Sequence, residues 1–135
     1  MNEIAALFRR SFGTLTFLPT LHTPEEDRAY FGGIVAEHEV WVWEESGSIL
    51  GFAALGDDEL THIYVEPSAH GRGIGGALMD RAKERRPEGF QLWVFQQNAN
   101  ARRFYEARGF VLVRETDGRG NEERTPDALY AWRPR

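Results

Sequence analysis

The 135-residue chain contains no cysteine, only two methionines and no long apolar run. The absence of cysteine excludes disulfides, thiolate metal ligands and a cysteine nucleophile. No segment approaches the roughly 20 apolar residues of a membrane-spanning helix. The N-terminal MNEIAALFRRSFG places its basic pair after the apolar residues, the reverse of a secretory signal. We therefore expect a cytoplasmic protein with no membrane partner and no metal cofactor.

A basic surface is also lacking. The chain has 16 Lys and Arg against 21 Asp and Glu, for a net charge of −5. Binding to nucleic acid requires a basic face that neutralises phosphates, so a general nucleic-acid binder is excluded. Hydrophobic residues make up 41% of the chain, enough to build a core. At this length we expect a single domain over residues 1–135.

The pattern along the chain alternates helices and strands. Apolar spacing predicts a helix over 3–12, and Thr23 followed by Pro24 is typical of the start of a second one. The glycine-rich stretch at 69–79 leads into a helix that ends before Pro87, and Asn98 caps a helix that ends at Gly109. Strands are expected at 38–45, 48–55, 60–65, 90–95, 110–116 and 128–132. This order predicts an α/β fold, a central mixed sheet of about six strands with helices on both faces.

The stretch AHGRGIGGALM, residues 69 to 79, holds four glycines in six positions. Glycines let a backbone approach a phosphate closely, and the N–H groups of a helix N-terminus supply donors and a positive dipole end. Gly71, Gly73 and Gly76 also satisfy the dinucleotide pattern G-x-G-x-x-G. However, five residues separate strand from glycine, and no acid follows the next strand. A nicotinamide or flavin oxidoreductase is therefore disfavoured.

Two motifs resemble those of the GNAT superfamily of N-acetyltransferases, which use acetyl-coenzyme A. YVEPSAHGRGIGGALM is similar to its first signature, V-x-P followed by [QR]-x-x-G-x-[GA], and LWVFQQNANARRFYEARGF matches every fixed position of its second. The resemblance covers about residues 25 to 133 and implies the GNAT fold. There are two departures: His70 replaces the usual Gln or Arg, and the family's first strand is missing or very short.

The resemblance implies where acetyl-coenzyme A binds. Backbone groups of the strand before the glycines would hold the pantetheine arm, with the Val65 N–H near the thioester oxygen, and the glycine loop would hold the pyrophosphate. The residues expected to contact acetyl-coenzyme A are Ile63, Val65, His70, Gly71, Arg72, Gly73, Ile74, Gly75, Gly76 and Asn98.

The resemblance also implies the catalytic residues. Tyr105 matches the tyrosine that protonates the departing thiolate, and Glu59 stands where some members carry a glutamate that deprotonates the amine, often through water. His62 or a water chain could serve as the base instead, whereas Glu66 is expected to be solvated. Since cysteine is absent, acetyl transfer to a primary amine of a small molecule or peptide is expected to be direct, in a ternary complex. The alternative is a non-catalytic acyl-coenzyme A sensor or scaffold.

Two further expectations concern partners. A cationic acceptor would suit the acidic residues Glu122 and Glu123 in the loop TDGRGNEERTPD, together with Glu25, Glu26 and Asp27. The opposing interpretation is that Arg119 and Arg124 neutralise the two loop glutamates. Without a first strand, the strand segment 40–43 would form an exposed edge with two tryptophans, which favours a homodimer.

Overall fold

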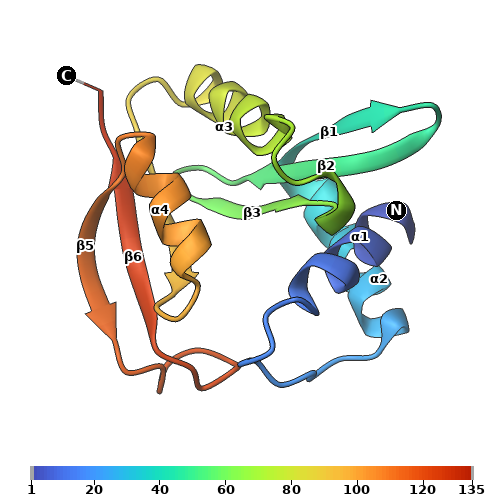
Figure 1. Ribbon diagram of the computed structural model, residues 1–135, viewed down its shortest axis with the longest axis horizontal. Helices are drawn as coiled ribbons and strands as arrows, with labels where there is room; N and C mark the ends of the chain where they lie inside the picture. Colours follow the sequence, from blue (N-terminus) through green and yellow to red (C-terminus); the bar gives the residue numbers. More distant parts are fainter. Residues whose placement is uncertain (1, 135) are drawn as a thin grey trace.

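The computed structural model describes residues 2–134, in which four α-helices and six strands form one layered unit (Figure 1). The chain begins with two helices, continues through an antiparallel three-stranded unit, and ends with two helices interleaved with three strands. The elements are α1 (Asn2–Phe12), α2 (Pro24–Glu37), β1 (Glu39–Glu45), β2 (Ser48–Leu55), β3 (Leu60–Val65), a short 3-10 turn η1 (Pro67–Ala69), α3 (Ile74–Arg85), β4 (Phe90–Phe95), α4 (Ala99–Ala107), β5 (Val111–Thr116) and β6 (Asp127–Trp132).

The local signals for the helix ends are confirmed. Thr23 caps α2 in a capping box, in which its side chain accepts a hydrogen bond from the Glu26 N–H and the Glu26 side chain accepts one from the Thr23 N–H. α3 ends at Arg85, before Pro87. In the described residues no strand precedes α1, as expected. No helix within residues 2–134 is long and apolar enough to cross a membrane.

The expected six-stranded sheet is confirmed, and it is divided in the middle. Strands β1, β2 and β3 form one antiparallel half, and β4, β6 and β5 form the other, in that order. Between β3 and β4, which run parallel, the described residues make a single bridge, Glu59 to Gln91, supported by a hydrogen bond from the Gln91 N–H to the Asp58 carbonyl at 2.9 Å. The two strands therefore separate beyond Glu59.

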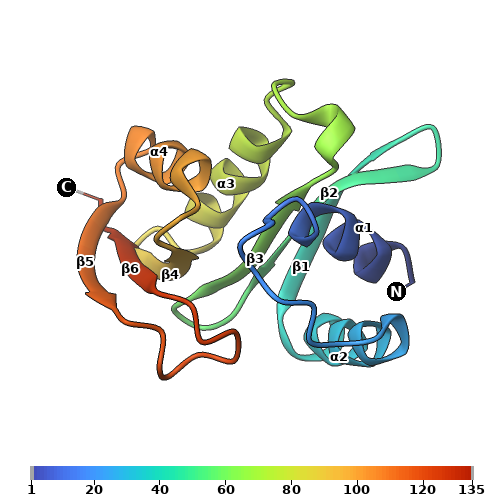
Figure 2. The ribbon, with the colours of Figure 1, turned by 60° about the horizontal axis from the view of Figure 1, so that its bottom comes forward.

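Two apolar cores lie on opposite faces of the first sheet half. Strand β2 is buried on both faces: Ala53 and Leu55 pack with α3, whereas Phe52 and Ala54 pack with α1 and α2. This explains why its sequence, SILGFAAL, is a nearly continuous apolar run. The first core continues under α4 in the second half. Figure 2 shows α3 and α4 on one side of the strands and α1 and α2 on the other.

Strand β1 is an edge strand, as expected. Its tryptophans nevertheless pack against the α3 side: the Trp41 indole N–H donates to the Leu78 carbonyl at 3.2 Å, and that of Trp43 donates to Glu45 at 2.9 Å. The two tryptophans are thus covered largely by the chain itself, while Val42 is exposed. The homodimer through this edge remains a prediction.

Candidate functional site

A groove of about 800 Å³ runs through the gap between β3 and β4. Its walls come from β3, the glycine loop, the start of α3, β4 and α4, and further lining residues come from the end of α1 and the segment after it. Because β3 and β4 separate after their single bridge, the groove lies where backbone hydrogen bonds would otherwise join the two strands. Nine of the ten residues expected to contact the cofactor, together with Tyr105, line the groove. They are Ile63, Val65, His70, Gly71, Gly73, Ile74, Gly75, Gly76, Asn98 and Tyr105. Arg72 is the one expected cofactor residue that does not line the groove.

Strand β3 presents backbone polar groups to this groove. Its ladder to β2 pairs Phe52 with Tyr64, and the Glu66 N–H donates to the Leu50 carbonyl at 2.8 Å. In an antiparallel pair, alternate residues turn their N–H and C=O groups to the partner strand. Residues 62, 64 and 66 therefore bond to β2, and Ile63 and Val65 direct their backbone groups into the gap. This orientation fits an extended, amide-containing arm.

The glycine loop provides the second backbone element. Gly71 and Gly73 both have φ +84°, a conformation that L side chains rarely adopt, and the space where a Cβ would lie is open at both. Gly73 is the N-cap of α3, and the first hydrogen bond of the helix runs from the Ala77 N–H to the Gly73 carbonyl at 3.0 Å. The N–H groups of residues 74–76 precede that bond and point out of the helix end, where an anion is favoured.

Gly75 and Gly76 have a different role from Gly71 and Gly73. A Cβ on Gly75 would lie 3.3 Å from the Phe104 ring, and one on Gly76 would lie 2.7 Å from the Arg108 guanidinium. Arg108 in turn lies over the Phe104 ring, 4.0 Å from its centroid. These two glycines therefore allow α4 to approach the start of α3 closely, in addition to lining the groove.

The two side chains expected at the phosphates have other partners. Arg72 forms an ion pair with Glu45 at 2.6 Å and does not line the groove. His70 lines the groove, but its Nε2–H donates to the Val65 carbonyl at 3.0 Å. The Val65 carbonyl also accepts a hydrogen bond from the Ser11 hydroxyl at 2.9 Å. The loop thus offers backbone donors to an anion, while the Arg72 side chain is held away from them.

Helix α4 contributes Asn98 and Tyr105. Asn98 caps the helix, its Oδ1 accepting from the Ala101 N–H at 3.3 Å, as predicted, and it also lines the groove. Tyr105 is buried in the main core and reaches the groove, and its hydroxyl makes no hydrogen bond to another residue in the range 2–134. Burial raises the pKa of Tyr105 well above its ordinary value. The phenol therefore stays protonated at neutral pH.

The candidate bases are placed differently. Glu59 directly precedes β3, at the bridge to Gln91, and is not among the groove-lining residues. His62 does line the groove, and its Nε2 lies 2.9 Å from the hydroxyl of Tyr30 on α2. Burial, and then the charge of His38, lower the pKa of His62 to about 4, so its imidazole is neutral at pH 7. Glu66 was expected to be solvated, but it is mostly buried and pairs with Arg10 at 2.7 Å.

Several groove residues escape sequence reasoning. One part of the groove is lined by Ser11, Thr14 and Leu15. Their sequence predicts only a helix end and a loop, so it does not indicate that they line a groove. Arg108 also lines the groove, beside the start of α3. An arginine directly before Gly109, inside the second motif, was the available signal for it. Arg108 brings a positive charge to the loop that Arg72 does not supply.

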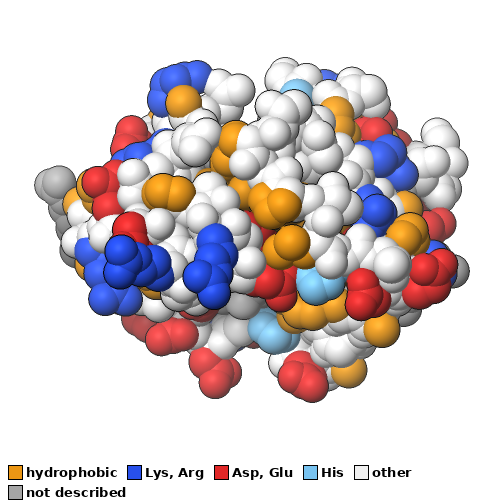
Figure 3. Space-filling view, turned by 90° about the horizontal axis from the view of Figure 1, so that it is seen from below, with side chains coloured by type: hydrophobic (Ala, Val, Ile, Leu, Met, Phe, Trp, Pro, Cys, Tyr) orange, Lys and Arg blue, Asp and Glu red, His pale blue; other side chains and the backbone are white. Residues whose placement is uncertain are grey.

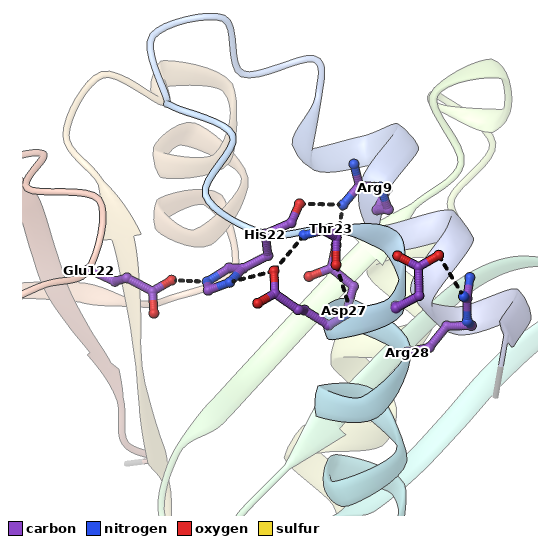
Figure 4. A network of polar contacts seen from close by, with 8 residues as sticks. Arg9, His22, Thr23, Asp27, Arg28 and Glu122 are labelled. Carbon is purple, nitrogen blue, oxygen red and sulfur yellow. Dashed lines mark hydrogen bonds and ion pairs between the residues drawn. The ribbon is translucent and has the colours of Figure 1, made fainter.

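The acidic residues expected to attract a cation are mostly paired (Figure 4). Asp27 is buried and bound by Arg9 at 2.6 Å, and Glu25 pairs with Arg28 at 3.2 Å. Glu26 is used in the capping box, and Glu122 contacts His22 across the gap between two loops. That contact raises the pKa of His22. Arg119 pairs with Asp117 at 3.1 Å rather than with a glutamate, so the expected neutralisation by Arg119 is wrong.

Glu123 is the exception in this acidic set. It is half-buried, and its carboxylate forms no ion pair within residues 2–134. It lines a small cavity of about 90 Å³ together with Phe8, Phe12, Leu21 and His22. Seen from below, histidine, acidic and hydrophobic side chains gather in the middle of this face, with most lysines and arginines toward its sides (Figure 3). No three His, Asp or Glu side chains of the described residues come together as a metal site would require.

Comparisons with known proteins agree with this geometry. The model of the acetyltransferase (GNAT) domain matches residues 36–112. Peptidyl-lysine N-acetyltransferase YiaC of Escherichia coli is 42% identical over 80 residues, which cover 58% of this chain and 54% of that protein. The solution structure of apo-form YjaB from Escherichia coli has a TM-score of 0.75 at 25% identity, covering 95% of this chain and 87% of that one.

A third comparison concerns a protein solved with a ligand. A GNAT family acetyltransferase from Elizabethkingia anophelis, with acetyl-CoA bound, has a TM-score of 0.66 at 15% identity, covering 79% of this chain and 83% of that one. At this identity the likeness shows the fold. The chain spans about half the length of the first curated relatives it matches.

Proposed function

The chain belongs to the GNAT acetyltransferase family, and from this premise we propose that it transfers an acetyl group from acetyl-coenzyme A to a primary amine. The transfer is direct, in a ternary complex, because the chain has no cysteine to carry the acetyl group. The acceptor is the amine of a peptide lysine or of a small molecule. The protein acts on it without a metal ion.

One observation carries this proposal: a single groove collects the backbone groups of β3, the open glycine loop and the Tyr105 hydroxyl. Ile63 supplies its N–H and C=O groups and Val65 its N–H for the amides of the pantetheine arm, since the Val65 carbonyl already accepts hydrogen bonds from Ser11 and His70. The loop and the start of α3 supply N–H groups for the pyrophosphate, with Arg108 beside them. A Cβ at Gly71 or Gly73 would extend into the open space beside these N–H groups.

The catalytic roles follow from the positions of the titratable groups. Tyr105, kept protonated by burial, gives its proton to the sulfur when the thioester C–S bond breaks. A backbone N–H of β3, fixed in place by the β2 ladder, stabilises the negative charge that develops on the thioester oxygen. Glu59, outside the groove wall, takes a proton from the acceptor side through water.

We further propose that a cationic acceptor is recognised by Glu123. YiaC is a peptidyl-lysine N-acetyltransferase, and a lysine peptide supplies both an amine and positive charge. Of the five acids considered for this role, Glu123 alone combines partial burial with a carboxylate that has no basic partner in the described range. Phe8 and Phe12, on the same small cavity, offer aromatic faces that suit a cation or an alkyl chain.

The test is release of free thiol from acetyl-coenzyme A with a panel of amines that includes lysine peptides, small cationic amines and neutral amines. Acceptor-dependent thiol release, with the acetylated amine identified by mass spectrometry, is the expected result. Tight binding of acetyl-coenzyme A without thiol release for any amine would instead make the protein a sensor or scaffold. Tyr105→Phe is the matched control, because it keeps the groove and removes only the proposed acid.

A further inference from the structure

Tyr30 and His62 form a hydrogen-bonded pair that the roles above leave unused. The Tyr30 hydroxyl on α2 lies 2.9 Å from Nε2 of His62 on β3, and the two rings meet edge to face with centroids 5.5 Å apart. His62 is enclosed by Phe8 and Phe31 as well. Its Nδ1 is buried and has no hydrogen-bond partner among the described residues. Nε2 is thus the ring atom through which His62 can exchange a proton.

The pair lies at the groove: His62 is one of its lining residues, and Tyr30 lies beside His62 on the α2 side. His62 precedes Ile63, whose backbone faces the gap between β3 and β4, and it lines the groove itself. Side chains alternate along β3, so His62 and Tyr64 point to the α1 and α2 side, whereas Ile63 and Val65 pack toward α3 and α4. Tyr30 is 52% exposed, and its hydroxyl lies against His62 on that side. A nucleophile entering between α1, α2 and β3 meets this hydroxyl.

We propose that Tyr30 and His62 take the proton of the attacking amine, an inference that rests on the proposed acetyl transfer. The amine N–H bond breaks toward the Tyr30 oxygen while the Tyr30 O–H proton passes to Nε2 of His62. The new C–N bond forms, the thioester C–S bond breaks, and the sulfur takes its proton from Tyr105. An ammonium acceptor thus loses one proton to Glu59 through water before attack and one through this pair, which His62 then releases to water.

The properties of the pair suit a relay. Tyr30 keeps its proton at neutral pH, since burial and the charges of Glu122 and Glu59 raise its pKa. His62 stays neutral, with its lone pair free, at every pH well above 4. An ordinary histidine, with a pKa near 6.5, would be partly blocked by protonation in the slightly acidic range. As a weak base, His62 carries the proton during transfer and returns it to water.

The experiment compares two acceptors, a lysine peptide and an acyl hydrazide, whose weakly basic nitrogen gives up its proton without help. Tyr30→Phe removes one oxygen and keeps the ring, and we expect kcat with the lysine peptide to fall about 100-fold. With the hydrazide, kcat should stay within about threefold of wild type, because the nitrogen of its adduct is acidic enough to lose the proton to water. Affinity for acetyl-coenzyme A should not change in either case.

His62→Gln is the second variant, since it keeps a hydrogen-bonding group but cannot take up a proton, and it should reproduce the same pattern. Tyr105→Phe is the contrast, because the loss of the sulfur proton should slow both acceptors alike. Equal losses with both acceptors in Tyr30→Phe, or no loss with the lysine peptide, would overturn the relay while leaving acetyl transfer intact. Failure of the wild-type protein to release thiol with either acceptor would overturn the proposed function, and the relay with it.

Discussion

The groove and the neighbouring surface between α1, α2 and the β5–β6 loop present different chemical groups. On the cofactor side, β3 and the glycine loop present main-chain N–H and C=O groups, and only Arg108 adds a charged side chain. On the amine side, where we propose that the acceptor enters between α1, α2 and the β5–β6 loop, the surface consists of side chains from distant parts of the chain. Tyr30 meets His62 there across 32 positions of sequence, and His22 meets Glu122 across 100.

This difference indicates which recognition is general, that of amides and phosphates, and which is specific, that of the acceptor. A backbone surface recognises amides and phosphates and is insensitive to most substitutions, because every residue supplies the same groups. A side-chain surface can change its acceptor through one or two substitutions. We therefore expect substitutions on the cofactor side to act only where they alter the backbone or block it, and those on the amine side to act through individual functional groups.

The largest effect is expected from Gly73→Asp. The substitution forces a side chain into a φ +84° position and adds negative charge at the start of α3, so affinity for acetyl-coenzyme A should fall at least about 1,000-fold. Gly47→Asp is the matched control, since Gly47 has φ +80° and open surroundings in the turn between β1 and β2. Calorimetry on both folded variants decides it: equal losses, or no loss in Gly73→Asp, would contradict a backbone phosphate site.

Tyr105→Phe should give the next largest effect. It keeps the buried ring and removes the acidic proton, so we expect kcat to fall about 100-fold with nearly unchanged affinity for acetyl-coenzyme A. Because burial raises the pKa of Tyr105, wild-type activity should show no decline from its ionisation up to about pH 10, its ordinary pKa. Steady-state kinetics and calorimetry check both parts. Full turnover in the variant would make Tyr105 a core residue only.

Burial of neutral His62 predicts a pH-dependent stability. Its pKa is about 4 when folded and 6.5 when unfolded, so its contribution is present above pH 6.5 and is lost as the pH falls toward 4. Wild type should therefore lose about 2 kcal/mol more of its free energy of unfolding than His62→Gln between pH 7 and 4.5. Urea unfolding at the two pH values measures this. Parallel losses in both proteins would mean that folding does not lower the pKa of His62.

The smallest effect is expected at Glu123. Glu123→Gln should raise KM for a lysine peptide about 3- to 10-fold at low salt and less at high salt, because a half-buried charge is partly screened. A neutral hydrazide should be unaffected. Glu25→Gln, at an exposed acid already paired with Arg28, is the control. A rise in KM that is the same for both acceptors would remove Glu123 from charge recognition.

The contrast between local backbone features and pairs of distant side chains also explains which parts of the fold and site could be predicted from the sequence. Gly71, Gly73 and Asn98 were predictable because a turn and a helix cap depend on a few consecutive residues. The strand and helix order followed from periodicity for the same reason. The ion pairs of Arg72 with Glu45 and of Glu66 with Arg10 were not predictable, since these partners are 27 and 56 positions away. The Tyr30–His62 pair exists only once α2 packs on β3, and no local pattern encodes that.

The most direct test is a titration of the isotope-labelled protein with coenzyme A, followed through the backbone amide signals in nuclear magnetic resonance. A backbone-built site predicts that the amides of Ile63, Val65 and residues 71–76 shift most, while those of the turn at Ser46 and Gly47 and of helix α2 stay in place. Shifts confined to α1 and α2, or no shift at residues 71–76 at saturation, would contradict it.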